Sequence, residues 1–364
     1  MLAIIILAVG IGYIGARAGT ESLPASPEGQ WEAIGRYAAD SALDLIEKAS
    51  TKKPSKGSMI VMTNAGYAEV NGSSTQGTLD GLASVTRASR GKQTLIEINS
   101  SSWTPLWFAV FDKESGYCAY LEPNPAEVAK LTAGSKKFSP ALFSIAATER
   151  VDAQYLYKHA SEYNSKFSNR VFGGNEFRII GIANAVAAGA PEHVVRAFEF
   201  HNHYCPGVTS GILMAQYVKT HFPSPKSGYF VQALDPYCKE DALMLLLNAT
   251  PATKSYAVVY PTDSDKASRV PEARNASTIV YRKNGESGKW EGRVLVFEWG
   301  STSCLKTGND IVDKLCQDLW YLERIGKPED FVKAVKEFEL PEGVAPADLM
   351  RPHADPLKAI GLAK

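Results

Sequence analysis

The stretch His201-Asn202-His203-Tyr204-Cys205-Pro206-Gly207 places two imidazoles and one thiol within five positions, in a chain with only six histidines and five cysteines. After it, apolar residues recur at three- and four-residue steps, which predicts a helix to about His221. Proline suits the first turn of this helix because its missing N–H is not needed there. Cys205 is therefore expected at or near the N-cap, where the helix dipole favours a thiolate.

A second cysteine repeats this arrangement. Residues 229–234 have the pattern of a strand, Asp235-Pro236 ends it, and a largely buried helix is predicted from Cys238 to Leu247. Two thiols at helix starts, together with His203 in an extended link two residues from Cys205, form a three-ligand site with an open position for water. Sulfur combined with imidazole favours zinc, with iron or copper as other candidates.

The same residues allow two other interpretations. Cys205 can be the nucleophile of a hydrolase or transferase, with His203 or His201 as base and Asp241 or Glu199 as the orienting carboxylate. Alternatively, a purely structural zinc joins two helices, and function lies in protein–protein contacts. In a metal site, Asp241 and Glu199 are the candidate outer acceptors for an imidazole N–H.

These motifs resemble those of the FmdE family, which is named after formylmethanofuran dehydrogenase, over about residues 170–300. The first motif combines His201-x-His203-x-Cys205-Pro206-Gly207 with Gly211, Met214 and Ala215, and the second combines Cys238-x-x-Asp241-Ala242 with Asn248-Ala249-Thr250. Three features depart from the family pattern: Asn202 stands where glycine is usual, Pro251-Ala252-Thr253-Lys254 replaces a stretch rich in glycine and lysine, and the chain has no C-terminal four-cysteine ribbon.

The resemblance implies an α+β domain in which helices pack on a small mixed sheet. It also implies one transition metal ion, zinc first and iron second, bound by His203, Cys205 and Cys238 with His201 as a fourth ligand. The family name refers to a molybdenum or tungsten enzyme of methanogens. The resemblance therefore suggests an envelope redox or metal-handling accessory of a methanogenic archaeon, and it leaves open whether this chain is an enzyme.

The expected fold class is mixed α+β in two domains. The segments are an apolar N-terminus (1–18), a linker (19–29), an N-terminal α+β domain of no recognised family (30–168), the FmdE-like domain (169–325) and a C-terminal helical extension (326–364). In the N-terminal domain we expect a long amphipathic helix over 31–46, a helix capped by Ser74, and helices near Ser139 and Val151. Strands are expected at 58–62, 94–98, 106–111 and 117–121.

The first residues indicate export to the cell envelope or the extracellular space. Residues 2–16 are almost wholly apolar, shorter than the roughly 20 residues that span a bilayer, and Ala16-Arg17-Ala18 offers a cleavage site before Gly19. No basic residue precedes the apolar run, so an uncleaved membrane anchor in 1–18 is the alternative. In an exported protein, Cys304 and Cys316 can form a disulfide, whereas Cys118 is expected to be a buried thiol.

Composition bears on the partners. The chain has 39 basic and 39 acidic residues, which provides no electrostatic footprint for nucleic acid and no polybasic surface for lipid headgroups. We therefore expect no nucleic-acid partner. The remaining expectations are membrane attachment through residues 1–18, and a homo-oligomer or an envelope protein as partner.

Overall fold

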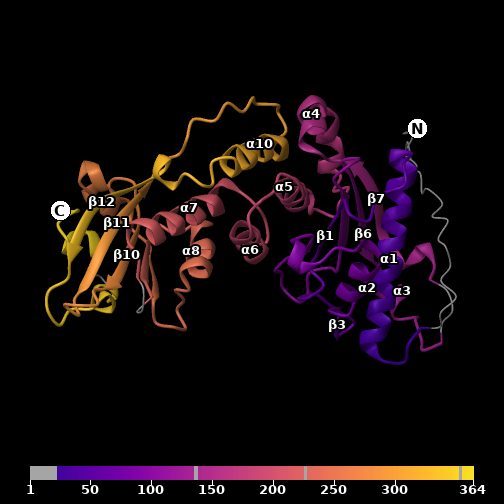
Figure 1. Cartoon of the computed structure of the whole chain (residues 1–364), viewed down its shortest axis with the longest axis horizontal. Coiled ribbons are helices and arrows are strands. Elements are labelled where there is room, and N and C mark those ends of the chain that lie inside the picture. Colours follow the sequence, from indigo (N-terminus) through magenta and orange to yellow (C-terminus); the bar gives the residue numbers. More distant parts are fainter. Residues whose placement is uncertain (1–22, 135–137, 225–227, 352–354) are drawn as a thin grey trace, which may run out of the picture. The chain divides into compact units, whose positions relative to one another are not determined.

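A computed structural model describes residues 23–134, 138–224, 228–351 and 355–364 (Figure 1). These residues form two compact units. The first comprises the chain to Tyr155 together with Arg170–Gly174, and the second comprises Leu156–Asn169 and Asn175–Lys364. The predicted signal or anchor segment, 1–18, lies outside the described residues, and no helix within the described ranges is long and apolar enough to cross a membrane.

The first unit is built on a five-stranded sheet. Its strands are β1 (Met59–Thr63), β4 (Leu95–Glu97), β5 (Phe108–Asp112), β6 (Tyr117–Pro123) and β7 (Phe143–Arg150), in the order β4-β1-β5-β6-β7. Only β1 and β4 pair in parallel in this sheet. The shorter elements are β2 (Glu69–Val70), β3 (Ser73–Ser74), α3 (Pro125–Val128) and two 3-10 turns at Arg90–Lys92 and Pro140–Leu142.

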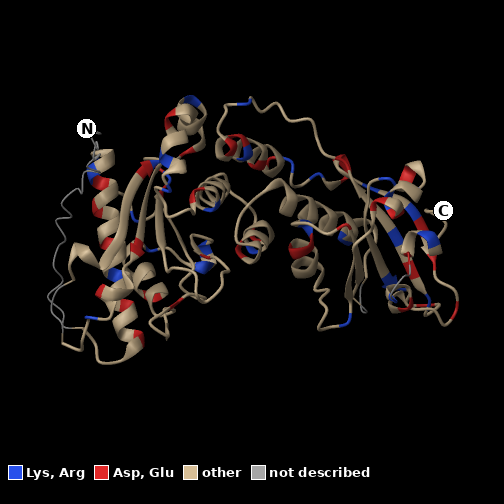
Figure 2. Ribbon diagram, turned by 180° about the vertical axis from the view of Figure 1, so that it is seen from behind, with Lys and Arg blue, Asp and Glu red and all other residues tan. Residues whose placement is uncertain are grey.

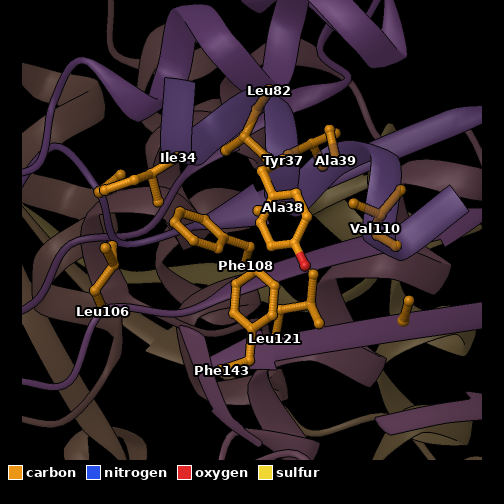
Figure 3. Packing of buried hydrophobic residues seen from close by; sticks show 14 of the residues in the cluster. Ile34, Tyr37, Ala38, Ala39, Leu82, Leu106, Phe108, Val110, Leu121 and Phe143 are labelled. Carbon is orange, nitrogen blue, oxygen red and sulfur yellow. The ribbon is translucent and has the colours of Figure 1, made fainter. Parts of the chain in front are cut away.

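Two helices, α1 (Pro27–Ser50) and α2 (Thr78–Thr86), pack together, and α1 covers the sheet (Figure 1). The helices approach closely at glycines: a Cβ on Gly35 would lie 2.3 Å from the Thr78 carbonyl oxygen. Figure 3 shows the core between α1 and the strands, where the Tyr37 ring stacks on Phe143 at 5.6 Å between ring centroids. Burial of such apolar side chains is the main driving force for folding of this unit.

Two predictions in this unit were wrong. The segment after Ser139 forms a 3-10 turn and then strand β7, not a helix, because its backbone pairs with β6 from Tyr117 to Pro123. Such tertiary pairing overrides local preference. Ser74 does not cap α2; it lies in β3, and Gly77 occupies the N-cap position.

The second unit contains a mixed five-stranded sheet in the order β12-β11-β10-β8-β9. Its strands are β8 (Phe230–Leu234), β9 (Tyr256–Val259), β10 (Ala276–Lys283), β11 (Trp290–Phe297) and β12 (Val332–Glu339), and β8 pairs with β9 in parallel. Its helices are α4 (Ala153–Ser168, mostly in this unit), α5 (Glu176–Ala187), α6 (Glu192–His201), α7 (Pro206–His221), α8 (Lys239–Leu247), α9 (Asp263–Ser268), α10 (Asp310–Leu322) and α11 (Pro356–Ala359). Three 3-10 turns lie at Pro271–Ala273, Pro328–Asp330 and Pro346–Met350.

The two faces of this sheet are covered differently. Thr278 points to α7, where its hydroxyl lies 4.0 Å from the Met214 sulfur. The alternate residues Ile279 and Tyr281 join an apolar cluster that includes Leu357 near the C-terminus. Helices packed on a small mixed sheet confirm the expected α+β class.

The structure also differs from the expected domain limits. Helix α4 belongs largely to the second unit, because the Asn309 amide ahead of α10 donates to the Ala160 carbonyl (3.2 Å) and to Asn164 Oδ1 (2.9 Å). The segment 326–364 is not a helical extension: residues 332–339 form β12, which pairs with β11 and so becomes the edge strand. Figure 2 shows basic and acidic residues interspersed along both units.

Candidate metal centre

The link between α6 and α7 supplies three donor side chains. Helix α6 ends at His201, and Asn202 reverses the chain in the left-handed conformation (φ 66°). Cys205 is extended (φ −156°, ψ 161°) and caps α7 through its own sulfur, which accepts from the Val208 N–H at 3.4 Å. Pro206 occupies the first turn. The predicted N-cap and helix start are therefore confirmed.

Cys238 directly precedes α8, as expected, and packing brings it to α7. A Cβ on Gly207 would lie 2.9 Å from the Cys238 Cβ and 3.5 Å from the Cys205 sulfur. One turn later, a Cβ on Gly211 would lie 2.2 Å from the Lys239 carbonyl oxygen. Two glycines therefore allow the backbones of α7 and α8 to approach, and this approach places the second thiol beside the first.

The structure brings four predicted residues together: His201, His203, Cys205 and Cys238. One donor atom from each lies within 4.8 Å of the others. A zinc ion about 2.3 Å from sulfur and about 2.0 Å from nitrogen needs donor pairs roughly 3.3–3.8 Å apart in a tetrahedron. The His201 Nε2–Cys205 Sγ distance is already 3.8 Å. Closure by no more than about 1.5 Å would thus fit all four donors to one ion.

His201 is held by a carboxylate. Its Nδ1 lies 2.6 Å from Asp241 Oδ2, which directs Nε2 toward the thiols. This is the usual arrangement behind a histidine metal ligand. Of the two carboxylates expected behind the imidazoles, Asp241 takes this place; Glu199 is buried on α6, and its role at the site stays a prediction.

His203 is held by an amide instead. Its Nδ1 lies 3.0 Å from Asn202 Oδ1, and its ring packs against Phe177 of α5 at 5.2 Å between centroids. The Arg178 guanidinium donates from Nε to the Asn202 carbonyl oxygen at 2.7 Å. Arg178 was not found from sequence, because an arginine on a helix carries no signal of a contact 24 residues away.

The pKa values of the two thiols are shifted in opposite directions. Hydrogen bonding with Cys238 and burial raise the pKa of the Cys205 thiol, whereas hydrogen bonds from Cys205, His201 and His203 lower the pKa of the Cys238 thiol. In the metal-free site, these contacts favour the thiolate at Cys238 over the thiolate at Cys205. Burial and the hydrogen bond with Cys238 thus oppose the effect of the helix start on Cys205, and the expected Cys205 thiolate stays a prediction.

The charge of His201 is set by its contacts with Asp241 and Cys238. Burial by itself lowers the pKa of His201, but hydrogen bonds to Asp241 and Cys238 outweigh it and raise the pKa to about 9. His201 is thus an imidazolium at neutral pH when no metal is bound. A bound cation would replace this proton, since metal ligands must be deprotonated.

Buried polar groups fix the start of α8. Lys239 is fully buried and pairs with Glu240, which also accepts from the Tyr256 hydroxyl. The preceding Tyr237 shares a hydrogen bond of 3.1 Å with the Ser210 hydroxyl of α7. Sequence reasoning missed these contacts, because Lys239 and Glu240 resemble ordinary solvated residues of a first helical turn.

Two imidazoles and two thiols, from the end of α6, the link after it and the start of α8, form a group that could hold one metal ion. Residues 200–290 match the family described as "FmdE, Molybdenum formylmethanofuran dehydrogenase operon". The chain thus carries an FmdE domain, and the match includes all four donors and Asp241. No curated protein matches this chain.

The remaining cysteines lie outside this centre. Cys304 and Cys316 form the expected disulfide, which ties the segment before α10 to that helix. Cys118 is a buried free thiol in β6, and burial raises its pKa.

Proposed function

We propose that this chain is an exported protein that binds one zinc ion through His201, His203, Cys205 and Cys238. The observation that carries the proposal is the convergence of the four donor atoms within 4.8 Å. Two thiolates neutralise a divalent ion, and a tetrahedral set of two sulfurs and two nitrogens suits zinc first, with iron as the second candidate.

Four protein donors favour a particular use of the ion. Catalytic zinc commonly has three protein ligands and one open position, whereas a structural ion is enclosed by four. The chain accordingly acts as a metal-handling or structural accessory, with the ion joining the α6–α7 link to α8. An envelope redox role and a part in the physiology of a methanogenic archaeon extend this proposal; the support for them is the family description alone.

Export is supported by the disulfide. Disulfides persist in oxidising compartments and are rare in reducing ones, and Cys304 and Cys316 are joined. Native protein denatured without reductant should show three reactive thiols, and five after reduction. Five reactive thiols before reduction would remove the support for export.

The intact mass of the native protein tests cleavage and should correspond to a start near Gly19. A retained Met1 would contradict cleavage and leave the membrane-anchor interpretation.

The decisive experiment is elemental analysis of the purified protein beside a Cys205→Ser/Cys238→Ser double variant. We expect about one zinc per chain in the wild type and almost none in the variant. A Cys304→Ser/Cys316→Ser variant is the matched control, since it makes the same exchange twice in the same unit outside the centre, and it should keep its zinc. Equal zinc in all three proteins would refute the assignment.

The second candidate is a cysteine nucleophile. The His201 Nε2–Cys205 Sγ distance of 3.8 Å is compatible with a base beside a thiol, and Asp241 orients the ring. The raised pKa of the Cys205 thiol argues against it, because the nucleophile must be the thiolate. A folded wild type that holds no metal would favour this candidate, and alkylation of Cys205 followed against pH would then test it.

A further inference from the structure

Asn202 occupies a backbone position that few residues accept. Its φ of 66° lies in the left-handed region, which glycine enters freely and asparagine tolerates. A helix C-cap alone would explain an asparagine here. The side chain, however, also contacts His203, and this second contact is not required by the turn.

The contact leaves two assignments to settle. The Asn202 amide can present either its oxygen or its nitrogen, and a neutral imidazole can carry its proton on either ring nitrogen. Arg178 decides the first. A guanidinium has only donors, and its NH2 lies 3.5 Å from Asn202 Oδ1 while Nε donates to the carbonyl oxygen of the same residue at 2.7 Å.

The amide therefore faces Arg178 and His203 with its oxygen, which can only accept. It follows that His203 Nδ1 is the donor and carries the proton. The lone pair of a neutral His203 is then on Nε2, the nitrogen left for a metal. Arg178 is itself held by a hydrogen bond from its guanidinium to Asn175 Oδ1 at the start of α5.

We propose that Asn202 and Arg178 are positioning residues that hold His203 in the Nδ1–H tautomer, with Nε2 directed to the metal. The inference rests on the proposed function and adds to it that the two histidines are supported differently. An anionic carboxylate makes His201 the stronger donor, whereas a neutral amide makes His203 the weaker one. His203 is then the ligand that detaches first.

The test is Asn202→Gly, which keeps the left-handed backbone and the carbonyl that Arg178 binds, and removes only the amide side chain. Loss of an outer hydrogen-bond partner lowers metal affinity about 10- to 100-fold, and we expect this loss in zinc competition against a chromophoric chelator. Asn202→Asp retains an acceptor oxygen and should restore the affinity. Long-range ¹H–¹⁵N spectra of the zinc-loaded wild type should show His203 protonated at Nδ1.

The matched control is Asn248→Gly, the same exchange at the left-handed C-cap of α8. It should leave both zinc affinity and the His203 spectrum unchanged. If Asn202→Gly does not fold, Arg178→Lys is the second variant. It leaves Asn202 in place and removes the planar guanidinium that contacts both the carbonyl oxygen and the side-chain oxygen of Asn202. We expect its affinity loss at the lower end of the same range.

The proposal would be overturned if Asn202→Gly kept a zinc affinity within about twofold of wild type and His203 were still protonated at Nδ1. Loss of an outer hydrogen-bond partner normally lowers metal affinity about tenfold or more. Failure of the proposed function has a different signature. In that case the wild type binds no zinc, yet its metal-free spectrum still shows the Nδ1–H tautomer in wild type and loses it in Asn202→Gly.

Discussion

The starts of α7 and α8 both carry a cysteine, but they hold it in different ways. Cys205 has an extended backbone, and its sulfur accepts a hydrogen bond from the first turn of its own helix. Cys238 has helical angles (φ −47°, ψ −25°), and its side chain makes no cap bond. The first thiol is thus placed by local structure, whereas the second is placed by the packing of α8 on α7. A cysteine at a helix start can therefore be placed by two different means. Only the placement by local structure, as at Cys205, can be deduced from the adjacent sequence.

The largest effect is expected for Cys205→Ser, which changes the thiol that local structure places. It removes a metal donor, while the serine hydroxyl can still cap α7, so metal affinity should fall by more than the roughly 100-fold that loss of an outer partner costs. The second unit should also become less stable, since the ion joins separate segments. Metal content and thermal unfolding measure the two effects. Unchanged metal content would remove Cys205 from the site.

Gly211→Ala tests whether α8 is placed by packing alone. The new Cβ would lie 2.2 Å from the Lys239 carbonyl oxygen, so α8 and Cys238 must move away from α7. Overpacking of this kind costs about 1–3 kcal/mol, and zinc affinity should fall with it.

Gly181→Ala on α5 is the matched control, because its Cβ would have no neighbour nearer than 3.4 Å. Urea unfolding of the second unit and zinc competition would measure both variants. A Gly211→Ala protein with full zinc affinity would show that the α7–α8 approach does not set the position of Cys238.

Asp241→Asn tests the contact between the two helix starts, because Asp241 on α8 orients His201 at the end of α6. Loss of the negative charge of this outer partner should lower zinc affinity about 10-fold, although the amide oxygen can still accept from the ring. The pH dependence should change as well. The raised pKa of His201 stabilises the metal-free fold fully below pH 6.5, and this contribution is lost as pH rises through about 9.

Zinc must displace that proton, so the contribution of His201 to the rise of wild-type zinc affinity with pH should end near pH 9. In Asp241→Asn this contribution should end at a lower pH. Parallel pH profiles in the two proteins would argue against a His201–Asp241 pair.

Ser210→Ala should have the smallest effect. It removes the hydroxyl that bonds Tyr237 just before Cys238, a contact of 3.1 Å. A partly buried hydrogen bond contributes about 1 kcal/mol to stability, and zinc affinity should change little. Denaturation measures the first and chelator competition the second. A large loss of zinc would mean that this single bond, and not the glycine packing, positions the second thiol.

Sequence patterns predicted the local part of this architecture. Proline after Cys205 indicated the start of α7, and the apolar spacing after it indicated the helix. The same approach located Cys238 at a helix start and placed Asp241 among the outer partners. The helix starts depend on neighbours within one or two turns, where geometry follows directly from residue type, whereas the contact of Asp241 with His201, 40 residues earlier in the chain, depends on packing.

The remainder depends on contacts between distant segments. Strands β7 and β12 were misassigned as helices because pairing with β6 and β11 decides their conformation. The role of Asn202 required its φ and the distant Arg178, so in the sequence it was visible only as a departure from glycine. The opposite pKa shifts of Cys205 and Cys238 follow from their proximity and burial, neither of which is a property of one segment.

The positions of the four donors also have a consequence for synthesis. His201, His203 and Cys205 leave the ribosome together, whereas Cys238 follows 33 residues later (238 − 205). Between them the chain must complete α7 and β8. A growing chain therefore offers two imidazoles and one thiol first, an incomplete set that can still exchange its ion. The last donor arrives with α8, so the docking of that helix is the step that would commit the polypeptide to its metal.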